Sequence, residues 1–107
     1  MPTAVVVTDV DGKPIGSSIG GRPKGYVQIT GVTSAAAVGL GAIPEGAVSV
    51  HVMVEGGDAR WRDDGTNPTS AVGMPLAEAT PFIYDKTLTA IKFVAKTVNV
   101  VLNIAFY

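Results

Sequence analysis

The sequence contains no cysteine and a single histidine, His51. The absence of cysteine excludes disulfide bonds, thiolate metal sites and thiol catalysis. A single histidine cannot form a His-rich metal site, and it leaves only one residue that could activate a nucleophile as histidine does. We therefore expect no metal ion and no other cofactor, and we interpret His51 as a surface or interface residue.

Charged side chains are also scarce, at 16% of the chain, whereas about 25% is typical of soluble domains. The eight basic residues are scattered and the net charge is −1. Nucleic-acid binding needs a basic patch that releases counterions, so we expect no nucleic-acid partner. The mean hydropathy of +0.35, combined with few charges, is typical of a subunit of a larger assembly. A rather hydrophobic monomer is the alternative.

Long apolar runs are missing as well. The N-terminus has no basic segment followed by an apolar stretch, so no signal peptide is predicted. The longest segment free of glycine and proline, residues 82–107, is interrupted by charges and is predicted not to span a membrane. We expect a protein that is made and kept in the cytoplasm without secretion.

Glycine and proline are abundant, with 13 and 7 residues in a chain of 107. They leave no room for an ordinary helix before residue 82. The clearest strand is residues 47–55, where four alternating valines share one face, from Val48 to Val54. Residues 4–8, 26–30 and 59–62 are further strand candidates, and Asp11-Gly12 is a hairpin signal.

The C-terminal segment fits both helical and strand spacing. Its β-branched residues and the lack of an N-terminal capping box favour strands. We predict strands at about 90–95 and 98–106, joined by a tight turn near Lys96-Thr97. Six to eight short strands predict one all-β domain over residues 1–107, either a small antiparallel β-sandwich or a jelly-roll-like barrel. The strand order stays open.

One short segment invites a chemical interpretation. Asp63 and Asp64 are adjacent carboxylates that follow Arg60 and Arg62, and paired acids can perform acid–base catalysis when one pKa is raised. However, Gly65 follows them directly, so a structural turn at Asp63, Asp64 and Gly65 is the better interpretation. Trp61, between the two arginines, is either a core residue or an interface anchor.

Residues 60–66, 68–69 and 73–76 together form a motif that resembles one in small structural proteins of tailed bacteriophages. The apolar segment 90–95 and the end of the chain, residues 102–107, are similar too, so the resemblance covers about residues 59–107. It implies a β-rich virion component: a capsid decoration or cement protein, or a minor head–tail or tail protein. It implies no catalytic residues.

The resemblance, together with the composition, implies a non-enzymatic virion structural protein that is made in the host cytoplasm. We expect it to self-associate as a dimer or trimer and to bind the major capsid protein or another virion protein. The candidate interface residues are Arg60, Trp61, Arg62, Phe106 and Tyr107. A carbohydrate-binding or receptor-binding β module is the second hypothesis. An enzyme that uses Asp63 and Asp64 is the third.

Overall fold

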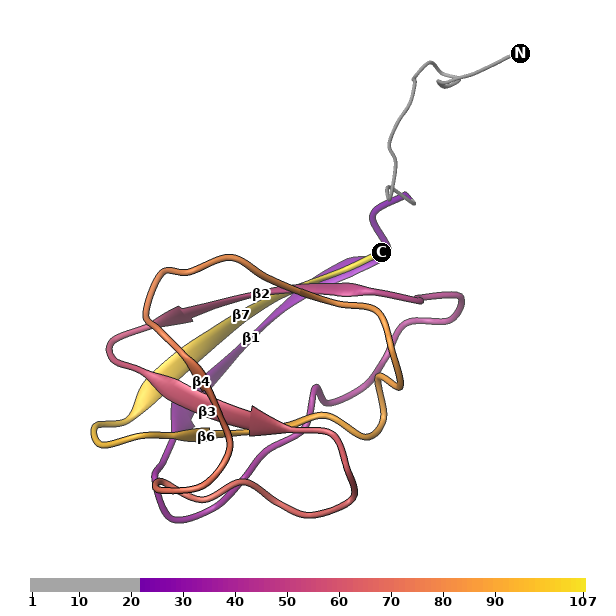
Figure 1. Cartoon of the computed structure of the whole chain (residues 1–107). Helices are drawn as coiled ribbons and strands as arrows, with labels where there is room; N and C mark the ends of the chain where they lie inside the picture. Colours follow the sequence, from indigo (N-terminus) through magenta and orange to yellow (C-terminus); the bar gives the residue numbers. More distant parts are fainter. Residues whose placement is uncertain (1–21) are drawn as a thin grey trace.

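A computed structural model describes residues 22–107, which form an all-β structure of two antiparallel sheets (Figure 1). One sheet has four strands in the order β1-β7-β2-β5, and the other has three in the order β4-β3-β6. The described residues contain no helix of the length and apolarity needed to cross a lipid bilayer. The strands are β1 (Gly25–Val32), β2 (Val50–Glu55), β3 (Ala59–Arg62), β4 (Met74–Leu76), β5 (Phe82–Tyr84), β6 (Lys92–Ala95) and β7 (Val100–Phe106).

The four-stranded sheet is organised around β7. This strand pairs with β1 along one edge and with β2 along the other, so that Ala105 lies between Tyr26 and His51. β2 in turn pairs with the short β5. Strands that are far apart in sequence are therefore neighbours, and the sheet depends on contacts between the two ends of the described chain.

The two sheets face each other across an apolar core. Alternation along β7 and β2 turns every second side chain inward, as the period of a pleated strand requires. No polar or charged residue is fully buried among residues 22–107. The core side chains of the four-stranded sheet include Val50, Val52, Val54, Val100, Leu102, Ile104 and Phe106. Those of the three-stranded sheet are Ala59, Leu76, Phe93 and Ala95, and loops add Leu40, Leu88 and Ile91.

The predicted β-sandwich is confirmed by these two facing sheets. The candidate strand at 26–30 lies within β1, and that at 59–62 coincides with β3. The C-terminal segment forms β6 and β7 as two strands, with no helix. Because these two belong to different sheets, the turn between them carries the chain from one layer to the other.

One detail differs from the sequence-based expectations. The alternation predicts that Val48 shares one face with Val50, Val52 and Val54, but Val48 precedes β2 and is 68% exposed, whereas the other three valines are buried. The N–H groups of Val48 and Ser49 both donate to the carbonyl of Tyr107, a two-on-one pairing like that of a β-bulge, which interrupts the alternation. The strand predicted at 4–8 and the Asp11-Gly12 turn lie outside the described residues.

The packing between sheets predicts which apolar residues stabilise the fold. Phe93 is fully buried in β6 and meets Phe82 edge to face, so Phe93→Ala is expected to lower the free energy of unfolding by about 3–5 kcal/mol. Ile104→Val, a smaller deletion in the same core, is expected to lower it by about 0.5–1.5 kcal/mol. Urea denaturation measures both losses.

Val48→Ala is the matched control, because the side chain is exposed and its removal is expected to change stability by less than about 0.5 kcal/mol. Equal losses for Val48→Ala and Ile104→Val would contradict this assignment of the core.

Candidate functional site

The motif around Trp61 builds a groove at one end of the three-stranded sheet. β3 ends at Arg62, residues 63–73 form a loop, and the chain returns as β4 with Met74 paired to Trp61. The space between the end of β3 and the start of β4 is an open groove of about 500 Å³. Its lining residues are Trp61, Arg62, Asp63, Asp64, Val72, Gly73 and Met74.

The floor of this Trp61 groove is apolar. The Trp61 ring is half-buried and packs against Phe82, with ring centroids 5.1 Å apart, and against the edge of Tyr84 at 6.0 Å. These contacts fix the indole while part of it faces the groove. Val72 and Met74, also in the lining, are 53% and 55% exposed. Trp61 is therefore both a packing residue of the sandwich and part of an exposed apolar surface.

Arg60 holds the shape of the loop. Its Nε donates to the carbonyl of Ser70 at 3.1 Å, and its Nη1 donates to the carbonyl of Gly73 at 3.0 Å. Two backbone carbonyls of the loop are thus tied to one strand residue. Among the candidate interface residues, Arg60 is a positioning residue, because its guanidinium binds the domain's own backbone.

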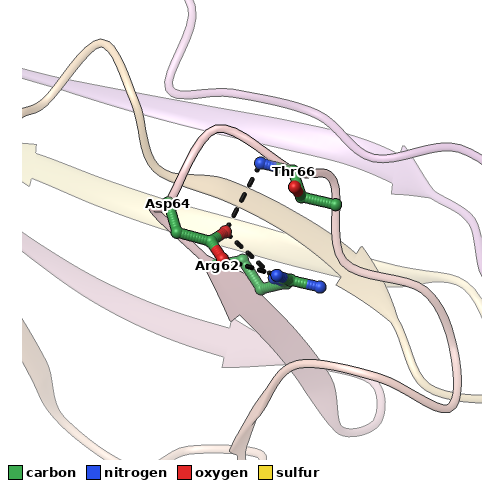
Figure 2. Close-up of polar contacts among 3 residues, drawn as sticks. All are labelled: Arg62, Asp64 and Thr66. Atoms are coloured by element: carbon green, nitrogen blue, oxygen red, sulfur yellow. Dashed lines mark hydrogen bonds and ion pairs between the residues drawn. The ribbon is translucent and has the colours of Figure 1, made fainter.

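Arg62 and Asp64 form a charged pair at the rim of the groove (Figure 2). Arg62 donates from both Nε and Nη2 to the two carboxylate oxygens of Asp64. These hydrogen bonds hold the pKa of Asp64 below its usual value. Asp64 also accepts from the N–H of Thr66 at 3.4 Å, and Gly65 between them has a φ of 90°, a left-handed conformation that favours glycine. The acid thus organises the turn as well as the rim.

Asp63 connects the loop to the opposite sheet. The hydroxyl of Tyr84, in β5, donates to Asp63 Oδ2 at 2.7 Å and accepts from the N–H of Thr87 at 3.2 Å. Burial of Tyr84, and then its hydrogen bond to Asp63, raises the pKa of the tyrosine to about 12. Asp63 and Asp64 therefore have separate partners, Tyr84 and Arg62, and each fixes a different side of the turn.

The remaining predicted residues lie elsewhere. Phe106 is only 2% exposed, because it shares the inward face of β7, so it is not available as a surface contact. Tyr107 is half-buried and exchanges backbone hydrogen bonds with Ser49. His51 is on the outer face of the four-stranded sheet, and its Nε2 has no hydrogen-bond partner within residues 22–107. In that same range no three His, Asp or Glu side chains gather where a metal ion could bind.

Three residues of the site escaped sequence-based reasoning. Val72 and Met74 complete the apolar floor, and Tyr84 anchors Asp63. The motif that contains Met74 was visible, but which of its side chains face the groove depends on the pairing of β3 with β4. The contact between Tyr84 and Asp63 spans 21 residues, and no local spacing indicates it.

The bond between Tyr84 and Asp63 predicts a pH-dependent contribution to stability. Tyr84→Phe is expected to lower the free energy of unfolding at neutral pH by about 1.5–3 kcal/mol, because the acceptor is a carboxylate. The wild-type advantage is expected to fall as the pH rises from 10 to about 12. In that window the unfolded tyrosine has lost its proton and the folded one still holds it.

Denaturation at several pH values measures this advantage. Tyr26→Phe is the control, because that hydroxyl bonds to Asn103 on the exposed face of the sheet. A Tyr84→Phe variant with a constant stability deficit from pH 9 to 12 would contradict the interpretation.

The shape of the groove depends on Gly73, whose φ is 146°. A Cβ atom there would lie 3.1 Å from the Cβ atoms of Arg60 and Pro68. Gly65→Ala has a similar backbone penalty at a φ of 90° but meets no atom within 4 Å. We expect Gly73→Ala to destabilise the protein by about 1–3 kcal/mol more than Gly65→Ala, because only the former overpacks. Equal stability of the two variants would contradict this prediction, because the loop would then accommodate the added methyl group at no cost in free energy.

No protein-family model, no curated protein sequence and no solved structure matches this chain. The function is therefore argued from the chemistry of the Trp61 groove.

Proposed function

We propose that this chain is a non-enzymatic structural subunit of a tailed-phage particle, and that it binds a capsid protein through the Trp61 groove. The observation that carries the proposal is the groove itself, an exposed apolar floor of Trp61, Val72 and Met74 with a charged rim. Protein interfaces have this anatomy, with aromatic and methionine anchors at the centre and polar groups around them.

The rigidity of the groove supports the proposal. Trp61 is held against two aromatic rings, Arg60 fixes the loop carbonyls, and Asp63 is tied to Tyr84. A binding surface that is already ordered loses less conformational freedom when a partner docks. The engagement of Asp63 by Tyr84 and of Asp64 by Arg62 also favours structural roles over catalysis for the two acids.

A capsid decoration or cement protein is the form of the proposal that we prefer. The composition suits a subunit that self-associates and multiplies a weak contact across a symmetric shell. A minor tail or head–tail protein would use the same groove. Immunogold labelling of purified particles distinguishes the locations, because label over the head supports the decoration role and label confined to the tail supports the alternative.

The test of the groove uses two matched variants. Met74→Glu and Ile83→Glu each place a charge on a three-residue strand, at side chains that are 55% and 56% exposed. Only Met74 lies in the groove. With particles that lack the protein, we expect Met74→Glu to weaken binding at least about tenfold, which corresponds to about 1.4 kcal/mol, and Ile83→Glu to bind like the wild type.

Co-sedimentation with particles of the phage that encodes the chain measures this binding. Absence of the protein from purified particles would overturn the proposal, as would equal binding of the two variants. The carbohydrate-binding hypothesis has one observation in its favour, since Trp61 lies beside carboxylates and an arginine in a groove. Glycan-array binding that Met74→Glu abolishes, without particle binding, would favour it instead.

A further inference from the structure

Four strands form the edges of the two sheets, and three of these edges are protected. β5 has only three residues and lies between Pro81 and the charged pair Asp85 and Lys86. β4 also has three residues, with Pro75 at its centre. Short length, proline and charge are the devices that keep an edge strand from pairing with another chain.

The edge of β6 is protected by the chain itself. The N–H of Phe93 donates to the carbonyl of Val38 at 2.7 Å, and the N–H of Val38 donates back to Phe93 at 2.8 Å. The N–H of Ala95 donates to the carbonyl of Thr33 at 3.0 Å. The segment that follows β1 therefore pairs along β6 and covers it.

Within residues 22–107, the outer edge of β1 has none of these devices. β1 is eight residues long, the longest of the described strands, and contains neither proline nor a charged residue. It pairs with β7 on one side, and no segment of residues 22–107 forms backbone hydrogen bonds along the other. A positive φ at Gly31 and a register shift between Ile29 and Val32 leave residues 25–29 as the regular part of this edge.

We propose that the outer edge of β1 pairs antiparallel with the same edge of a second copy of this chain, joining two four-stranded sheets across a two-fold axis. A row of unpaired backbone N–H and C=O groups forms hydrogen bonds with another extended strand. The edge therefore specifies an extended polypeptide segment as its binding partner. The inference deepens the proposed function and rests on the self-association within it.

Charge favours a second copy as the occupant. An uncharged edge approaches its own copy without like-charge repulsion. Antiparallel pairing also places Arg22 and Lys24, which precede β1, at opposite ends of the joined strands. Two identical edges related by a two-fold axis form a closed, self-complementary contact, which is the commonest form of homodimer.

The faces of the strand restrict the register, because the outward side chains of one copy must oppose outward side chains of the other. Directly opposed residues of an antiparallel pair point to the same face of a sheet. Tyr26, Gln28 and Thr30 are exposed on one face of β1, so these side chains oppose one another across the axis. Gln28, the middle residue of the three, is expected to lie closest to its own copy.

The test places charges of one sign or of the other on the outer face of β1 in the full chain. We compare two double variants: one combines Gln28→Lys with Thr30→Lys, and the other has Glu at both positions. Both are expected to fold, because Gln28 and Thr30 are exposed. Each is expected to raise the dimer dissociation constant at least tenfold, because like charges oppose each other. An equimolar mixture of the two is expected to form a heterodimer of near wild-type affinity. Light scattering over a concentration series measures all three, and Ile83→Lys is the control at the protected edge.

A wild-type monomer at all concentrations would overturn the inference. If the β1 amides that point away from β7 were protected from hydrogen exchange in that monomer, residues 1–21 of the same chain would be the occupant. A dimer that tolerates the lysines, or a mixture that fails to associate, would overturn it as well. Particle binding by Met74→Glu reports on the groove separately, so failure of the dimer leaves the proposed function to its own test.

Discussion

The inward row of side chains on β7 is the contact on which the rest of the structure depends. Four alternating residues, from Val100 to Phe106, fill the centre of the core. The same strand provides the hydrogen-bonding partner of β1 on one side and of β2 on the other. Because one strand supplies both the hydrogen-bonding ladder and the packing, a defect in β7 would weaken the four-stranded sheet and its packing against the other sheet at the same time.

The Trp61 groove is attached to this core without being part of it. Phe82 and Tyr84 belong to the four-stranded sheet, yet they contact Trp61 and Asp63 at the end of the other sheet. The loop of residues 63–73 is therefore fastened to both layers. A loop fastened at several points keeps its exposed apolar residues in one arrangement, which suits recognition of a fixed neighbour in an assembly better than capture of variable partners.

Local chemistry was sufficient to predict several of the strands. β3 and most of β1 follow directly from their residues, and the β-branched content of the C-terminal segment decided correctly between helix and strand. β4 and β5 were missed because three residues are too few to show a period. The exposed position of Val48 depends on the bulge beside Tyr107, which is a contact between distant parts of the chain.

In the candidate site, too, local features were predictable from the sequence and contacts between distant residues were not. Its turn was predictable because Asp63, Asp64 and Gly65 are turn residues wherever they occur. The role of Arg60 as a positioning residue was not, since its acceptors are carbonyls 10 and 13 residues away. The burial of Phe106 was foreseeable, because its alternation with Ile104 already indicates an inward side chain.

The position of β7 in the chain order also bears on synthesis. It is the last of the described strands to emerge from the ribosome, and it begins 68 residues after β1 ends at Val32. At about 5–20 residues per second, that interval lasts roughly 3–14 s. Until β7 arrives, β1 lacks the one neighbour it has among the described strands. For those seconds of synthesis β1 has no paired strand among residues 22–107, on either edge, and an unpaired strand of a nascent chain is exposed to aggregation.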